Sequence, residues 1–505
     1  MKKISCLFFL FFCMLSFQVQ ANMPVQANAP VQVNVSVPAS TYEMRAVWIS
    51  YLEINSLLKD LDKNSFERKT VEMFDNISEL GLNTVIVQVR PFSDAIYPSS
   101  YFPWSKYIGT PNYDPFALMV NKAKEKGLSI HAWINPYRIG PDIIGPARQW
   151  VNNEQYIVSV NNSWYYNPAV PAVRELILAG IKEVLENYQV DGIHFDDYFY
   201  PTTDTSFDDI IYAASKTSMT LADWRRENVN ILIRDAYQLI KNHDPGISFG
   251  ISPGGNLKLN FNNLYADAAK WGREPGYVDY LAPQLYYGYQ NQTFPFLAVL
   301  KEWNEIGDTD LYIGLAAYKI GLDDRWAGDG RNEWLEKSDI LARQVLDSRA
   351  NSNSKGFIFF SYNSLFSPSN PAEITKLREL LAEIAIVING NTIRYDIAPQ
   401  FMKGRVLVPF RGIFESLGAQ VDWHEGQITA YKDDVTINLE LYNKIMLVNG
   451  RKIELDVEPI IINSRTLVPI RAVSEALKAK VEWKANPPQV DITLYVNFPK
   501  TGKRS

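Results

Sequence analysis

Two periods of apolar residues alternate along the chain from residue 43 to about residue 385. Short apolar runs rich in β-branched and aromatic residues are typical of buried strands, and runs of helical period separate them. The clearest helical run follows Pro168 and Pro171, where apolar residues recur at helix spacing from Val173 to Leu185. Eight strands are predicted, at Arg45–Leu52, Thr84–Arg90, Ser129–Asn135, Gly192–Tyr198, Ser248–Ser252, Val278–Tyr286, Leu311–Tyr318 and Gly356–Tyr362.

This alternation predicts an α/β fold, a parallel (β/α)8 TIM barrel that spans residues 43–385. A doubly wound sheet is the alternative. The barrel is favoured because eight is the number of strands that closes it, and because polar residues follow nearly every predicted strand rather than gathering at one crevice.

A tandem repeat follows the predicted barrel. Ile388-Asn389-Gly390 recurs as Val448-Asn449-Gly450, and Val421-Asp422-Trp423 recurs as Val481-Glu482-Trp483, in both cases 60 positions later. Each copy, 386–446 and 447–498, reads as strands around a short helix, at 410–417 and 470–477, and residues 499–505 form a tail. Neither copy clusters histidines or pairs carboxylates in a plausible site, so a structural or adhesive α+β module is expected.

The N-terminus has the form of a signal peptide. Two lysines precede an apolar run from Leu7 to Phe17, and Val19-Gln20-Ala21 has the small-x-Ala form of a cleavage site. The run is shorter than the roughly 20 residues of a membrane span. We expect a leader at 1–21, a flexible linker at 22–42, and a secreted or cell-surface protein with no membrane span after cleavage.

Composition narrows the classes of function. Both cysteines, Cys6 and Cys13, lie in the leader, so the mature chain offers no disulfide, thiolate nucleophile or cysteine-ligated zinc. Loss of the two leader lysines moves the formal charge from −6 to −8, and no basic stripe argues for nucleic acid. Aromatic residues make up 13% of the chain, which leans weakly toward carbohydrate because sugar rings stack on aromatic side chains.

The candidate chemistry centres on the fourth predicted strand, Val190–Pro201, which reads VDGIHFDDYFYP. Alternation along a strand puts His194, Asp196 and Tyr198 on one face and Asp197 on the other, from which Asp197 could turn outward only if the strand has ended. Hydrolysis of a glycosidic bond needs a proton donor, and a carboxyl group between apolar and like-charged neighbours can serve near neutral pH. Asp196 is therefore expected to be the acid/base, unless it only caps a helix or holds an arginine.

The second catalytic group is less clear. Asp197 and Asp94 are candidates, or the acetamido group of an N-acetylated sugar attacks its own anomeric carbon. His131 and His194 raise the question of zinc, but the mature chain lacks cysteine, and hydrogen-bonding roles inside the barrel are favoured; no cofactor is expected. Long loops after the second, third and fourth strands carry aromatic residues, including Trp104, that could line a groove.

Six segments together resemble a known family: RAVWIS, VIVQVRPFSDAIYPS, HAWINPYR, VDGIHFDDYFYP, ISPGGN and LAPQLYYGY. They are similar to the glycosyl-hydrolase-like barrels grouped at a distance with family-10 glycoside hydrolases. The resemblance covers residues 43 to about 385 and implies a secreted or envelope hydrolase of peptidoglycan glycan stripped of its stem peptides. Family-10 enzymes carry glutamates at the ends of the fourth and seventh strands, where this chain has Asp196-Asp197 and Tyr318-Lys319.

The fourth strand also resembles the acidic strand of family-18 chitinases when Asp191-Gly192 is aligned with its start. His194 and Tyr198 then replace two of the acids, and Asp196 is kept. With Gln284 and Tyr286 on the sixth strand, this resemblance implies an N-acetylated substrate. The residues expected to bind substrate are Arg90, Trp104, His131, Asn135, Arg138, His194, Tyr198, Gln284 and Tyr286.

The tandem repeat resembles the N-terminal domain of copper amine oxidases, a stalk-like module, and implies a spacer or a cell-wall attachment unit without copper. The leading hypothesis is a secreted glycoside hydrolase of N-acetylated cell-wall polysaccharide. A catalytically silent glycan-binding or scaffold protein is the alternative. A third hypothesis is an α-glycosidase that uses Asp196 as its nucleophile.

Overall fold

The computed structural model describes residues 43–494, apart from 368–370, 383, 394, 396, 403–404, 463–464 and 486–487. The predicted leader, the linker and the tail lie outside the described residues. In the part of the chain that is described, no helix is both long and apolar enough to cross a membrane.

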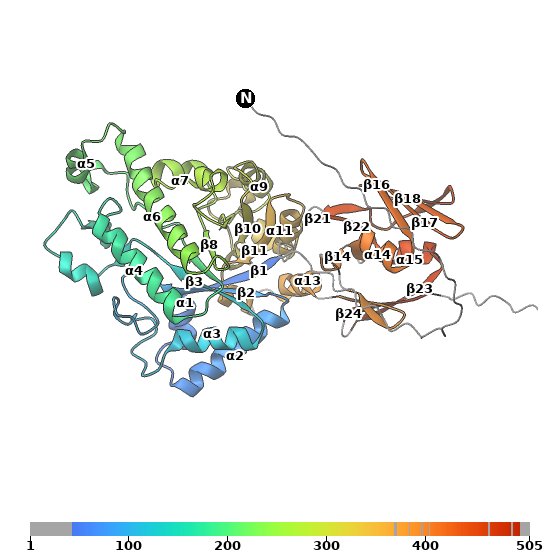
Figure 1. The fold of residues 1–505 in the computed structure, drawn as a ribbon, viewed down its shortest axis with the longest axis horizontal. Coiled ribbons are helices and arrows are strands. Elements are labelled where there is room, and N and C mark those ends of the chain that lie inside the picture. Colours follow the sequence, from blue (N-terminus) through green and yellow to red (C-terminus); the bar gives the residue numbers. More distant parts are fainter. Residues whose placement is uncertain are drawn as a thin grey trace, which may run out of the picture. The chain divides into compact units, whose positions relative to one another are not determined.

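Eight parallel strands close into a barrel in the order β1-β11-β10-β9-β8-β7-β3-β2, with helices around the outside (Figure 1), which confirms the predicted TIM barrel. The strands are β1 (Met44–Ile49), β2 (Thr84–Arg90), β3 (Ser129–Ile134), β7 (Gly192–Phe195), β8 (Ser248–Ile251), β9 (Tyr280–Leu281), β10 (Asp310–Leu315) and β11 (Ser354–Phe359). The longer helices between and after them are α2 (Lys63–Glu79), α3 (Pro115–Glu125), α4 (Pro171–Asn187), α6 (Leu221–His243), α9 (Phe296–Asn304), α11 (Ile340–Arg349) and α13 (Pro371–Leu381).

Shorter elements decorate the barrel. The loop after β3 carries a three-stranded sheet in the order β4-β6-β5. The short elements are β4 (Arg138–Gly140), β5 (Ile157–Val160), β6 (Ser163–Tyr166), α1 (Tyr51–Glu53), α5 (Asp209–Ser215), α7 (Leu257–Asn263), α8 (Ala268–Arg273), α10 (Glu333–Glu336) and α12 (Tyr362–Leu365).

The fourth barrel strand, β7, ends at Phe195 rather than at the predicted Tyr198. The backbone N–H of Asp197 donates to Oδ1 of Asp196 over 2.7 Å. Aspartate side chains that bond to neighbouring backbone groups compete with regular secondary structure, which explains why the strand stops here. Alternation therefore does not apply beyond Phe195, and the prediction that Asp197 points to the opposite face loses its basis.

Two glycines make room for large side chains inside the barrel. A Cβ atom on Gly250 of β8 would lie 2.0 Å from the ring of Tyr280. A Cβ atom on Gly192 of β7 would lie 2.4 Å from the ring of His131. The rings of His131 and Tyr280 thus occupy space that any other residue at these positions would fill.

The C-terminal repeat forms three sheets that the two copies share. The first sheet runs β13-β12-β24-β23, with β12 of the first copy beside β24 of the second. The second sheet runs β16-β17-β18-β19-β20, and the third runs β14-β15-β22-β21. The copies thus exchange hairpins, and the helices α14 and α15 lie between the two outer sheets (Figure 1).

The elements of the repeat are β12 (Ala385–Ile388), β13 (Asn391–Ile393), β14 (Gln400–Met402), β15 (Arg405–Pro409), α14 (Phe410–Ser416), β16 (Gln420–His424), β17 (Gln427–Lys432), β18 (Val435–Glu440), β19 (Ile445–Val448), β20 (Arg451–Glu454), β21 (Ile460–Ile462), β22 (Arg465–Pro469), α15 (Ile470–Ala476), β23 (Ala479–Ala485) and β24 (Pro488–Leu494).

Candidate active site

A pocket of about 270 Å³ lies at the carboxyl ends of the barrel strands, where TIM-barrel enzymes place their chemistry. Six of the residues predicted from the sequence line it: Arg138, Asp196, Asp197, Tyr198, Gln284 and Tyr286. They follow three strands that are distant in the sequence, β3, β7 and β9, so the closed barrel is what brings them together.

Asp196 and Asp197 both face this pocket, because β7 has already ended. Asp196 is buried, with 6% of its surface exposed, and Asp197 is half-buried. Nε2 of Gln284 donates to Oδ1 of Asp196 over 3.2 Å and to the carbonyl of Ser252 over 3.0 Å. The amide of Gln284 therefore fixes the orientation of the Asp196 carboxyl group.

Burial raises the pKa of Asp196 well above its ordinary value, and the negative charge of Asp197 is the second-largest cause of this rise. Burial also raises the pKa of Asp197, which a hydrogen bond from the Asp196 side chain opposes. Two adjacent carboxyl groups in one pocket do not both ionise easily, so the pair retains one proton above the ordinary titration range of aspartate, and the larger rise in pKa is that of Asp196. The pair thus offers a proton donor beside a carboxylate.

Aromatic side chains and one arginine complete the wall. The guanidinium of Arg138 lies 4.1 Å from the ring centre of Tyr198 and 4.6 Å from that of Phe92. Burial raises the pKa of Tyr198 to about 12 and that of Tyr286 well above the ordinary value, so both hydroxyls stay protonated. These groups present hydrogen-bond donors and ring faces to a ligand, as sugar-binding sites do.

His131 and His194 do not line the pocket; both are buried in the barrel interior. Nε1 of Trp48 can only donate, so Nε2 of His194 accepts its hydrogen bond over 3.2 Å. Nδ1 of His194 then donates to the Tyr280 hydroxyl, which in turn donates to Nδ1 of His131, over 3.0 Å in each case. Burial lowers the pKa of His131 to about 4 and that of His194 well below its ordinary value, so both rings are neutral.

Asn135 and Arg90 are also buried away from the pocket wall. Oδ1 of Asn135 accepts from Nε1 of Trp133 over 2.9 Å, and thereby positions a ring that does line the pocket. The guanidinium of Arg90 lies 3.6 Å from the ring centre of Phe102 and packs against Gly180 of α4. The structure therefore gives these two residues supporting positions rather than a ligand contact.

Asp94 and Trp104 line a second pocket of about 280 Å³, formed by the loops after β2 and β4. Burial raises the pKa of Asp94 to about 6, so this carboxyl group titrates near neutral pH. Tyr51 of the first pocket and Tyr107 of the second are in contact, with ring centres 4.6 Å apart. The two pockets are therefore neighbours, and Asp94 lies in the second pocket rather than beside Asp196.

Several residues of the first pocket escaped the sequence-based prediction. Gln88, Ser252 and Tyr318 lie at or near the ends of predicted strands, which placed them around the mouth of the barrel, but they were not singled out as site residues. Trp48 and Trp133 lie within predicted strands, where the sequence pattern does not distinguish them from ordinary core residues. The remaining lining residues that were missed are Ser50, Tyr51, Leu52 and Phe360.

No group of three or more histidine, cysteine, aspartate or glutamate side chains that could hold a metal ion is present among the described residues. The pocket contains two adjacent carboxyl groups with raised pKa values, an oriented amide and aromatic rings. This set of groups suits general acid/base chemistry on a sugar.

Comparison with known proteins also indicates a glycoside hydrolase. The family model for glycosyl hydrolase-like 10 matches residues 43–328, and that for the copper amine oxidase N-terminal domain matches residues 387–492. The chain belongs to the glycosyl hydrolase-like 10 family. The two matches confirm the resemblances to the glycosyl-hydrolase-like barrels and to the copper amine oxidase N-terminal domain, and they support a glycoside hydrolase-like function.

Two proteins that are similar in sequence to this chain carry the name glycosyl hydrolase. YngK of Bacillus subtilis is 35% identical over 370 residues, which cover 65% of this chain and 69% of YngK. DigH of Escherichia coli K12 is 30% identical over 352 residues, which cover 62% of this chain and 79% of DigH. Among solved structures, the glycoside hydrolase domain of PgaB from Bordetella bronchiseptica is 12% identical with a TM-score of 0.49, and the match covers 67% of this chain and 98% of that domain.

Proposed function

We propose that this protein is a secreted or cell-surface glycoside hydrolase that cleaves N-acetylated bacterial cell-wall glycan. The observation that carries the proposal is the pair Asp196 and Asp197, in which a buried carboxyl group with a raised pKa lies beside a second carboxylate in one pocket. Membership of the family supports hydrolysis of a glycosidic bond, and the sequence of the leader supports export.

In the proposed reaction Asp196 gives its proton to the glycosidic oxygen as the bond from that oxygen to the anomeric carbon breaks. The acetamido oxygen of the same sugar forms the new bond to the anomeric carbon. Asp197, already ionised, stabilises the positive charge that develops on the acetamido group. Water then attacks the anomeric carbon as the bond from this carbon to the acetamido oxygen breaks, and the water transfers a proton to Asp196, which restores the starting state.

Acetamido participation is proposed because the two carboxyl groups are neighbours in sequence and share one pocket wall. Enzymes with two separate catalytic carboxylates hold them on opposite sides of the scissile bond, roughly 5 Å or more apart. Asp94 belongs to the neighbouring pocket and is better placed to bind an adjacent sugar than to attack the same carbon.

The test is incubation of the full chain, without its leader, with purified peptide-free peptidoglycan strands, followed by mass spectrometry of the soluble sugars. The native protein and an Asp308→Asn variant should release fragments alike, because Asp308 is exposed in the loop that enters β10 at the opposite end of the barrel. Asp196→Asn should lower the rate of release by a factor of roughly 100 to 10,000.

N-deacetylated strands serve as the matched substrate. They lack the acetamido oxygen, so their cleavage should be slow even by the native protein. Equal release by the native protein and Asp196→Asn would refute the role given to Asp196. Binding of the strands without release by the native protein would instead favour a catalytically silent glycan-binding protein.

A further inference from the structure

The two copies of the C-terminal repeat differ at the helix each contributes. In the first copy the ring of Tyr395 lies directly on α14, where a Cβ on Gly412 would be only 2.6 Å from it. The residues 60 positions later are Leu455 and Ala472. The smaller leucine side chain leaves space over α15 that the tyrosine ring fills over α14.

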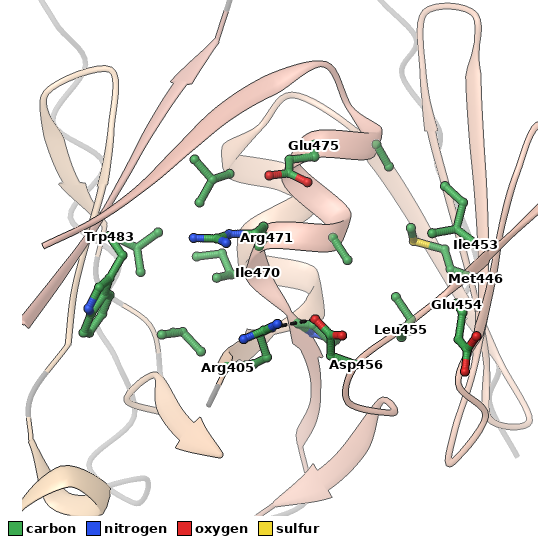
Figure 2. A pocket seen from close by; sticks show the side chains of 16 residues that line it. Arg405, Met446, Ile453, Glu454, Leu455, Asp456, Ile470, Arg471, Glu475 and Trp483 are labelled. Atoms are coloured by element: carbon green, nitrogen blue, oxygen red, sulfur yellow. Dashed lines mark hydrogen bonds and ion pairs between the residues drawn. The ribbon is translucent and has the colours of Figure 1, made fainter. Parts of the chain in front are cut away.

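That space is a groove of about 590 Å³, within the range of roughly 300–1,000 Å³ that is usual for ligand pockets. Figure 2 shows α15 along its floor, with Trp483 of β23 on one side and Met446 and Ile453 on the other. Trp483 is 41% exposed and Ile453 is 37% exposed, so apolar surface faces the groove. We call it the α15 groove.

The charged residues of the α15 groove are arranged differently from their counterparts on α14. Arg411 and Glu415 of α14 form an ion pair at 3.6 Å, whereas Arg471 and Glu475 of α15 make no ion pair with any residue that the structure describes. The Arg471 side chain extends toward the side of the groove that carries Trp483 (Figure 2). Within the groove, the ion pair between Arg405 and Asp456 is already satisfied at 2.6 Å.

We propose that the α15 groove binds a short peptide that carries both a carboxylate and an amine. The planar guanidinium of Arg471 matches a carboxylate in two hydrogen bonds. Glu475 and Glu454, which also line the groove, match an amine. The aliphatic floor buries small apolar side chains, for which the peptide gains free energy in proportion to the apolar area removed from water.

A peptide fits these groups better than a neutral glycan. A sugar chain would leave the charges of Arg471 and Glu475 without a counter-charge and would cover aliphatic side chains with hydroxyl groups. The proposal concerns the repeat alone and does not depend on the activity of the barrel.

The test is calorimetric titration of the full chain without its leader. The probe is the tetrapeptide Ala-Glu-Lys-Ala with free termini, and the control probe is acetylated and amidated Ala-Gln-Gln-Ala, which has no charge. The charged peptide should bind with a dissociation constant below about 1 mM, and the uncharged peptide at least tenfold more weakly. Equal binding of the two peptides, or no binding of the charged peptide, would overturn the proposal.

Variants taken from the other copy provide the controls. The double change Leu455→Tyr and Ala472→Gly reproduces the pair that the first copy already accommodates, and should fill the groove and abolish binding. Arg471→Ala should weaken binding by about tenfold or more, and Arg411→Ala on α14 should leave it unchanged. Native binding by the double variant with an unchanged melting temperature would place the peptide elsewhere and refute the α15 groove as its site.

Discussion

Tyr280→Phe tests the hydrogen-bond chain beneath the active-site pocket. The change removes one oxygen atom and leaves the ring in place. Nδ1–H of His194 then loses its acceptor and Nδ1 of His131 loses its donor, both in the fully buried interior. Each buried polar group left without a partner costs about 1–3 kcal/mol, so the free energy of unfolding of the barrel should fall by about 2–6 kcal/mol.

The assay is urea unfolding followed by tryptophan fluorescence, because only Trp423 and Trp483 of the 12 tryptophans lie in the C-terminal repeat. Tyr312→Phe is the matched control. Its ring centre lies 4.8 Å from that of Tyr280, and its hydroxyl makes no hydrogen bond with any described residue, so a change within about 0.5 kcal/mol is expected. Equal stability of the two variants would show that the hydrogen-bond chain from Trp48 to His131 is not formed as described.

Three further predictions concern the site. The rate of cleavage should persist above the ordinary titration range of aspartate and fall as the pH rises through the raised pKa of Asp196. The Asp197→Asn change removes the negative charge that helps to raise this pKa, so the alkaline limb of the pH–rate profile should move to lower pH. Because the pKa of Asp196 is higher in the folded than in the unfolded protein, protonated Asp196 favours the folded state at low pH. This contribution to the free energy of unfolding is lost as the pH rises from about 4 through the raised pKa. The Asp196→Asn variant should therefore have a higher melting temperature than the native protein at pH 7 but not at pH 4. Trp104→Ala should raise KM about tenfold with kcat within about twofold, measured on glycan strands, and a collapse of kcat at constant KM would contradict a binding role.

The sequence allowed the barrel to be predicted because each strand is a short apolar run between clear helical runs. The carboxyl ends of parallel strands must meet at one face, so the sequence alone assigns Asp196, Gln284 and Tyr286 to a common mouth. The position of Asp197 could not be decided in this way, because alternation holds only while the strand continues, and the local hydrogen bond at the end of β7 cannot be read from the pattern.

Other features depend on contacts between distant residues. His131 and His194 both bond to Tyr280, which lies 86 positions or more away along the chain, and the sequence shows this residue only as one aromatic in an apolar run. The exchange of hairpins between the repeat copies is also invisible in the sequence, because the pattern of strands is the same whether each copy pairs with itself or with the other.

The most direct test of the central claim, that Asp196 donates a proton to the leaving group, compares two substrates of different leaving-group acidity. The Asp196→Asn variant and the native protein are assayed on an N-acetylated glycan oligosaccharide and on the corresponding dinitrophenyl glycoside, whose leaving group departs without a proton. The variant should lose at least about 100-fold in kcat/KM on the oligosaccharide and less than about tenfold on the dinitrophenyl glycoside. An equal loss on both substrates would contradict the assignment of Asp196 as the proton donor.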